Sequence, residues 1–270
     1  MTKEGQQPET RSIETRLEIN ASVDAVWKAL TDAEEITQWF SLQAAVTPGA
    51  GGSVCWTWDE LVEWKSRIEI WEPRSHLRLA YDRPATTESP SAQLAMDFYL
   101  EGQSGRSVLR LVHSGFGRGT DWDEEYDGVR RGWQYELRSM RHYLERHRGQ
   151  KRNVVFLRRN FDFSEDEAWN RLSRLLGLQN LRETGELREG TRYDIATAAG
   201  DSFSGEVLVF SPPKEFCATI ENLNNGLLRV APEKCAGRNE VWVWFATYGV
   251  EQATLNDLRN RWEPRLNESF

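Results

Sequence analysis

The sequence of 270 residues has few of the side chains that usually carry metal, redox or disulfide chemistry. It contains three cysteines and four histidines, and Cys55, Cys217 and Cys235 lie far apart with no CxxC pair. This spacing excludes a zinc-knuckle or dithiol motif, and the odd number of thiols is typical of a reducing compartment. We therefore expect no metal site, no cofactor and no disulfide framework.

Long apolar runs and an excess of positive charge are also missing. No stretch reaches the roughly 18 apolar residues of a membrane-spanning helix, and the N-terminal MTKEGQQPETRS has no apolar signal region. With 34 basic and 42 acidic residues, the formal net charge is −8, which disfavours nucleic acid or an anionic membrane as the partner. We expect a cytoplasmic protein without a nucleic-acid partner or a membrane span.

Motifs of catalysis are absent as well. The sequence contains no GxSxG, GxGxxG, P-loop or HExxH pattern. The acidic cluster at residues 121–127 does not match a calcium loop, and it precedes a predicted helix, where acidic side chains favour the helix dipole. The sequence therefore predicts no catalytic residue and no metal ligand.

Aromatic side chains, in contrast, are abundant. The chain has twelve Trp, eleven Phe and seven Tyr. Large rings that must be buried favour either a thick core or an aromatic-lined pocket.

The chain also repeats one pattern. Residues 13–40 and 153–178 each predict a strand followed by a helix, and SVDAVWKAL aligns with SEDEAWNRL so that Trp27 and Trp169 coincide. Ser22 and Ser164 are the expected N-caps, and Glu167 completes an S-x-x-E capping box. A repeat spacing of roughly 140 residues indicates tandem domains. We place these domains at 10–148 and 152–270, joined by a charged linker.

Each half then continues with alternating strand patterns and ends in an amphipathic helix. In the first half, the helix has one apolar stripe, formed by Val129, Trp133, Leu137, Met140 and Leu144. Strands joined by short turns form an antiparallel sheet, and its apolar face must be covered by the long helix. The predicted class is α+β, with two curved antiparallel sheets, each packed on a long C-terminal helix.

The order of these motifs resembles a known family. In the first half it comprises Ala25-Val26-Trp27 with Ala29 to Asp32, then Trp39-Phe40, and later His113, Gly115-Phe116, Gly132-Trp133, Leu137, Met140 and Tyr143-Leu144. This framework resembles the SRPBCC or START-like superfamily, in the subgroup homologous to the C-terminal domain of the activator of the heat-shock protein ninety ATPase. The resemblance covers most of residues 12–147, and the second half is a divergent copy without the H.GF…GW ending. It implies tandem helix-grip domains, often with a pocket between sheet and helix.

Ten inward positions of the first domain are the candidate ligand-binding residues. They are Trp39, Phe40, Trp56, Trp58, Trp64, Phe98, His113, Phe116, Trp133 and Leu137. Periodicity predicts that they are buried, and it leaves open whether they line a cavity or fill a solid core. We expect His113 to form hydrogen bonds within the core, close to the loop at 115–119, and the alternative is a ligand contact or an acid–base role.

Three functions follow as hypotheses. The first is a non-enzymatic binding protein that holds a hydrophobic small molecule between the sheet and the C-terminal helix of the first domain. The alternative, from fold analogy, is a co-chaperone-like module with a heat-shock protein ninety ATPase as its partner. The third is a START-like cyclase or hydrolase, for which only His113 and scattered carboxylates could serve.

Overall fold

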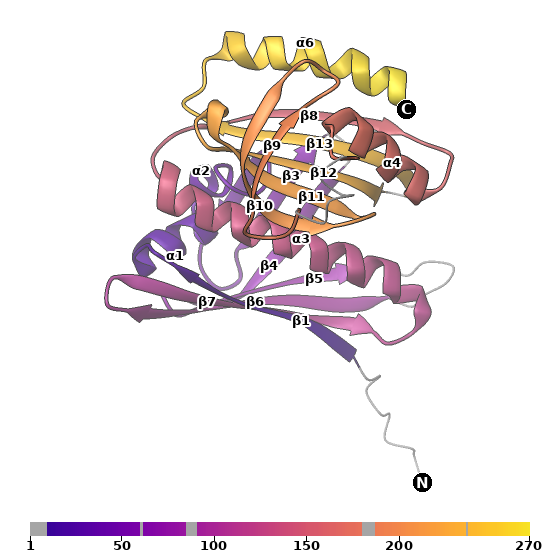
Figure 1. Cartoon of the computed structure of the whole chain (residues 1–270). Coiled ribbons are helices and arrows are strands. Elements are labelled where there is room, and N and C mark those ends of the chain that lie inside the picture. The colour runs from indigo at the N-terminus through magenta and orange to yellow at the C-terminus, as the bar shows by residue number, and fades with distance from the viewer. Residues whose placement is uncertain (1–9, 60–61, 85–90, 180–186, 236) are drawn as a thin grey trace. The chain divides into compact units, whose positions relative to one another are not determined.

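The computed structural model describes residues 10–59, 62–84, 91–179, 187–235 and 237–270. The chain divides into two compact units, Met1–Arg148 and Gly149–Phe270. Each unit contains one antiparallel sheet, and each ends in a long helix (Figure 1). The α+β class and the tandem helix-grip plan are therefore confirmed.

The described residues of the first unit form a seven-stranded sheet in the order β1-β7-β6-β5-β4-β3-β2. Its strands are β1 (Thr10–Ile19), β2 (Gln43–Thr47), β3 (Ser53–Asp59), β4 (Val62–Glu72), β5 (His76–Arg83), β6 (Ala92–Gln103) and β7 (Arg106–Gly117). All neighbouring strands run antiparallel. Strands β2 to β7 follow one another as a meander, and the first strand closes the order beside the last.

The two short helices of the first unit begin where the sequence predicts. For α1 (Val23–Thr31), the Ser22 hydroxyl accepts a hydrogen bond from the backbone N–H of Ala25. For α2 (Ala33–Ile36), the Asp32 carboxylate accepts bonds from two backbone N–H groups. These bonds satisfy donors that the first turn of a helix leaves without partners.

The long helix α3 (Asp123–His142) continues into one wider turn, Tyr143–His147. Figure 1 shows it crossing one face of its own sheet. Trp133, Leu137, Met140 and Leu144 are each no more than 5% exposed, and Val129 packs against a small core cluster around Phe116. The predicted apolar stripe is confirmed as the surface that holds α3 on the sheet.

The second unit repeats this plan with a six-stranded sheet, ordered β8-β13-β12-β11-β10-β9 among the described residues. Its elements are β8 (Arg152–Asn160), α4 (Glu165–Leu176), β9 (Arg192–Ala196), β10 (Ser202–Ser211), β11 (Glu215–Ile220), β12 (Gly226–Cys235), β13 (Arg238–Tyr248) and α6 (Gln252–Ser269). Trp262 on α6 is buried, and its indole N–H donates to Asp201 at 2.8 Å. This bond fixes α6 to the turn between β9 and β10.

One detail of the second unit differs from the sequence prediction. Ser164 caps α4 by accepting from the Glu167 N–H, but the reciprocal capping-box bond is not found within the described residues. The Glu167 carboxylate instead pairs with Arg171 and Arg174 along the exposed face of the helix. The capping box therefore forms only in half.

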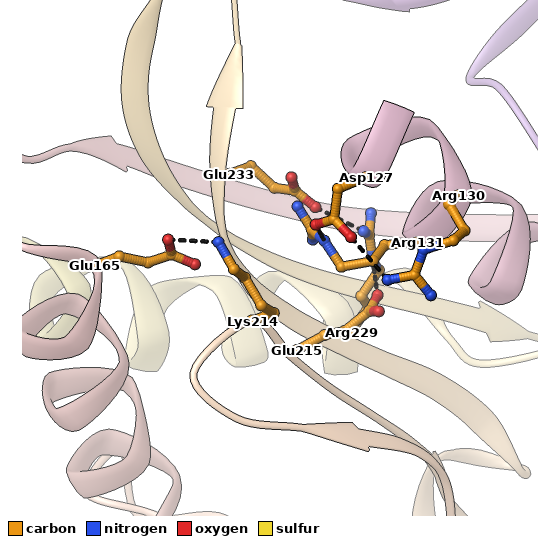
Figure 2. A network of polar contacts seen from close by, with 8 residues as sticks. All are labelled: Asp127, Arg130, Arg131, Glu165, Lys214, Glu215, Arg229 and Glu233. Atoms are coloured by element: carbon orange, nitrogen blue, oxygen red, sulfur yellow. Dashed lines mark hydrogen bonds and ion pairs between the residues drawn. The ribbon is translucent and has the colours of Figure 1, made fainter. Parts of the chain in front are cut away.

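The second unit also buries a charged network that no sequence motif indicated (Figure 2). Arg229 on β12 donates to Glu215 on β11 at 2.6 Å and to Glu233 at 2.7 Å. Burial opposes the charge of Arg229, but the two carboxylates outweigh it and raise the pKa of the guanidinium. In the same view, Lys214 pairs with Glu165, which ties the turn before β11 to the start of α4.

Candidate functional site: the ring cluster of the first unit

The nine aromatic candidates of the first unit come together between its sheet and α3, and we call them the ring cluster. Trp39 and Phe40 follow α2, whereas the others stand on β3 (Trp56, Trp58), β4 (Trp64), β6 (Phe98), β7 (His113, Phe116) and α3 (Trp133). Trp58 and Trp64 are partly exposed and the other seven are buried. The tenth candidate, Leu137, is buried one turn beyond Trp133 on α3.

Phe40 occupies the centre of one half of the ring cluster. Its ring stacks on Trp133 at a centroid distance of 5.6 Å and on Trp39 at 4.9 Å. It meets Trp56 and Trp58 edge to face at 5.1 and 5.0 Å. These are the distances and geometries of favourable aromatic pairs. The rings from β3 and α3 are therefore in contact through Phe40.

His113 occupies the centre of the other half, and its hydrogen bonds define its tautomer. The Trp133 indole N–H donates to His113 Nδ1 at 2.9 Å, and His113 Nε2 lies 3.0 Å from the Tyr81 hydroxyl. Because an indole nitrogen can only donate, Nδ1 is an acceptor, and the single hydrogen of the neutral ring is on Nε2. His113 therefore donates to the oxygen of Tyr81.

The ionisation of His113 agrees with this arrangement. The ring is fully buried, and burial lowers the pKa of His113 to about 3. Both ring nitrogens are engaged within the core, as expected for a structural histidine. Its hydrogen-bonding partners are Tyr81 and Trp133. The expected contact with a loop at 115–119 is instead a ring contact at 4.8 Å with Phe116, which still belongs to β7.

Tyr81 is the site residue that sequence reasoning did not select. It stands on β5 in phase with the inward Leu77 and Leu79, so alternation places it inside, but a tyrosine at a strand end does not by itself indicate a site. Its ring meets Trp64 at 4.8 Å. Burial, with Glu125 nearby, raises the pKa of the Tyr81 hydroxyl. The group therefore stays protonated and keeps a hydrogen to donate.

Three further buried donors in this region have no hydrogen-bond acceptor among the described residues. They are Trp56 Nε1, Trp64 Nε1 and Ser66 Oγ. Trp56 and Trp64 face each other in the pairing of β3 with β4, and Ser66 is the next inward position on β4. A buried donor without an acceptor costs about 1–3 kcal/mol relative to a paired one. The inner side of this sheet therefore carries donors whose partner is not another side chain of the described core.

Charged side chains near the ring cluster are paired with each other. In the acidic segment before and within α3, Asp123 pairs with Arg11, and Glu125 with Arg83. Asp127 pairs with Arg130 and Arg131 (Figure 2), and these bonds lower its pKa against the opposing effect of burial. Within the described residues, no three His, Cys, Asp or Glu side chains form a group that could hold a metal ion.

Two hollows occur at positions away from the ring cluster. One, of about 400 Å³, lies in the second unit between α4 and α6 and is lined by Arg171, Arg174 and Arg265 among others. The other, of about 410 Å³, surrounds the tip of the β6–β7 hairpin near Gln103 and Arg106. Both are lined mainly by polar side chains, unlike the aromatic site that the sequence predicts.

One protein-family model matches most of the first unit. Residues 20–145 match the model of the family described as Activator of Hsp90 ATPase homolog 1-like protein. The match begins just after β1 and ends in the turn that follows α3. No curated protein matches the chain. Within the described residues, no helix has both the length and the apolar character needed to cross a membrane.

Three solved structures illustrate the similarity of fold. Protein MLL2253 from Mesorhizobium loti is 20% identical, with 51% of this chain and 98% of that chain covered and a TM-score of 0.46. The Aha1 dimer from Colwellia psychrerythraea is 18% identical, with coverages of 52% and 99% and a TM-score of 0.44. The di-domain ARO/CYC BexL of the BE-7585A biosynthetic pathway is 14% identical, with coverages of 96% and 95% and a TM-score of 0.43.

A pair of serine substitutions tests whether the Ser66 hydroxyl lacks a partner. Ser66→Ala removes a buried donor without an acceptor, so the free energy of unfolding in urea should rise by about 1 kcal/mol. The matched control, Ser107→Ala, removes an equally buried hydroxyl that donates to the Ala21 carbonyl at 2.7 Å. That variant should lose about 1 kcal/mol. Equal losses in both variants would contradict the assignment.

The low pKa of His113 predicts how stability depends on pH. An unfolded chain binds a proton at this residue below pH ~6.5, whereas the folded chain does so only near pH 3. Above pH ~6.5, His113 is neutral in both the folded and the unfolded chain and does not change the free energy of unfolding. As the pH falls from ~6.5 towards 3, only the unfolded chain takes up the proton, and the free energy of unfolding decreases by about 1.4 kcal/mol per pH unit. From pH 6.5 to 4.5, His113 should therefore cost about 2–3 kcal/mol.

The His113→Gln variant isolates this contribution. Glutamine offers an acceptor to Trp133 and a donor to Tyr81 but does not titrate. The variant and the unmodified chain have all their other ionisable groups in common. Urea unfolding of both proteins at a series of pH values should give curves that diverge below pH ~6.5. Parallel curves would show that His113 is not held neutral.

Proposed function

We propose that the first unit, whose residues 20–145 match the model of the Activator of Hsp90 ATPase homolog 1-like family, is a non-enzymatic binding domain. It holds a hydrophobic small molecule between the sheet and α3, against the ring cluster and Leu137. The observation that carries this proposal is the set of buried donors at Trp56, Trp64 and Ser66, which have no acceptor among the described residues.

A purely structural core would not favour these donors. Phenylalanine or alanine at the same positions would bury apolar surface without the cost of an unpaired N–H or O–H. Small-molecule sites, in contrast, combine mostly apolar and aromatic walls with a few polar groups that orient the ligand. The ring cluster has this composition, because its donors stand among rings that contact one another.

Binding requires some of these rings to move. Their centroids are only 4.8–6.2 Å apart, which is normal contact for a packed core. Trp58 and Trp64 are the partly exposed members. We infer that the ligand enters beside these two tryptophans and replaces their contacts with the buried rings.

A fluorescent probe tests the binding function. Neutral 1-aminoanthracene, titrated into the full chain, should show saturable enhancement of its fluorescence as it enters the apolar site. Ser66→Leu places a bulky side chain on the inner face of β4 and should weaken binding at least tenfold, since overpacking a core closes the space for a ligand.

Lys65→Leu is the matched control, because Lys65 is exposed on the opposite face of the same strand. It should bind the probe like the unmodified chain, and thermal unfolding should confirm that both variants are folded. Ser66→Val serves as a milder replacement if Ser66→Leu does not fold. Saturable binding that neither Ser66 variant weakens would place the probe elsewhere, and no saturable binding at all would contradict the function.

The family match favours a second candidate, a chaperone partner in the cytoplasm. On this hypothesis, the chain acts as a co-chaperone-like module that raises the ATPase rate of an Hsp90-class chaperone. The measurement is steady-state ATP hydrolysis by the purified chaperone with increasing amounts of the full chain, and with an unrelated protein as control. An increase of at least twofold is expected, and an unchanged rate at saturating chain would end this hypothesis.

A further inference from the structure

We propose that the ligand of the first unit is an uncharged, mainly apolar molecule that presents hydrogen-bond-accepting oxygens, and that the Tyr81 hydroxyl is the donor that selects it. The chemical class comprises aryl ketones, quinones, esters and ethers on an apolar frame. This inference rests on the proposed binding function and specifies what the site recognises.

The hydrogen bonds that end at Tyr81 run in one direction. Trp133 can only donate to His113, so His113 must donate through Nε2 to the Tyr81 oxygen. The hydrogen of the Tyr81 hydroxyl is then not used in this chain of bonds. No other acceptor for it is found among the described residues. Trp133 on α3 therefore determines that the Tyr81 hydroxyl acts as a donor, although Trp133 and Tyr81 do not form a hydrogen bond with each other.

The polar groups that neighbour Tyr81 are donors as well. The Trp64 ring meets Tyr81 at 4.8 Å and Trp56 at 5.8 Å, and both indole N–H groups lack an acceptor among the described residues. Ser66 precedes Arg67, which pairs with Ala80 of β5, and its buried hydroxyl also lacks a partner among the described residues. An indole N–H cannot accept a hydrogen bond. The site therefore favours oxygen acceptors on the ligand over hydrogen-bond donors.

The surroundings of His113 and Tyr81 favour an uncharged ligand. The rings in contact with His113 belong to Trp64, Tyr81, Phe116 and Trp133, and none of them carries a formal charge. The charges that act on Tyr81 are those of Arg83 and Glu125, which are paired with each other at 2.7 Å. A carboxylate or an ammonium group would lose its hydration here without gaining a counter-charge, which is costly. An uncharged ligand avoids this cost.

A matched pair of probes separates acceptor recognition from simple hydrophobic binding. Fluorene and 9-fluorenone share one tricyclic frame, and only fluorenone carries a carbonyl oxygen. The affinity of each is measured by displacement of 1-aminoanthracene from the full chain and from the Tyr81→Phe variant. This substitution should weaken fluorenone binding about tenfold and change fluorene binding less than twofold. Comparing both probes in both proteins cancels their different hydration.

Tyr99→Phe is the control variant, because Tyr99 stands on β6 and stacks on His76, outside the ring cluster. It should change neither affinity. A second variant, Trp133→Phe, removes the donor to His113 Nδ1 and allows the other tautomer, in which Nε2 accepts from Tyr81. Trp133→Phe should therefore reduce the preference for fluorenone without removing fluorene binding.

The outcomes distinguish this inference from the proposed function. If Tyr81→Phe weakens both probes equally, or neither, acceptor recognition by Tyr81 is wrong while the binding site stands. If neither probe displaces 1-aminoanthracene from the unmodified chain, the inference fails. If 1-aminoanthracene itself does not bind, the proposed function fails with it. A selective loss of fluorenone affinity in Tyr81→Phe, absent in Tyr99→Phe, supports both.

Discussion

The hydrogen bond from the Trp133 indole to His113 Nδ1 joins the long helix of the first unit to its sheet. It is buried on both sides, and it determines which nitrogen of the imidazole carries the hydrogen. Through that choice it also determines how the Tyr81 hydroxyl is used on a strand two positions away in the sheet order. One contact between helix and sheet thus has consequences for both packing and recognition.

The same core shows a conflict between stability and function. Aromatic contacts around Phe40 and His113 stabilise the packing of α3 on the sheet, whereas the donors at Trp56, Trp64 and Ser66 lower stability because they are buried without acceptors. Proteins retain such unfavourable groups mainly where they serve a site. In the second unit, Arg229 instead has two carboxylate partners at hydrogen-bond distance. That unit nevertheless also buries donors without hydrogen-bond partners among the described residues, at Trp169 Nε1, Ser173 Oγ and Trp244 Nε1.

Much of the fold could be predicted because periodicity reports burial. The helical spacing of Trp133, Leu137 and Met140 predicted the face of α3, and strand alternation indicated which side chains of the sheet point inward. Periodicity carries no information on which donor meets which acceptor, so the partners of His113 and the role of Tyr81 required the structure. For the same reason, Arg229 and Glu215 gave no signal, since they are distant in sequence and meet only across two paired strands. The Glu167 carboxylate pairs instead with Arg171 and Arg174, one and two turns further along α4, and the spacing of the capping motif does not report this competition.

We propose that the buried indole donors of the ring cluster, at Trp56 and Trp64, form hydrogen bonds with an acceptor on the ligand. The most direct measurement is the ¹H–¹⁵N NMR spectrum of the tryptophan indoles, assigned by single Trp→Phe variants and recorded with and without fluorenone. The account predicts that the indole resonances of Trp56 or Trp64 shift downfield and exchange more slowly with solvent when the probe is bound, while that of Trp262, already bonded to Asp201 in the second unit, stays unchanged. Unchanged resonances of Trp56 and Trp64 at saturating probe would contradict it.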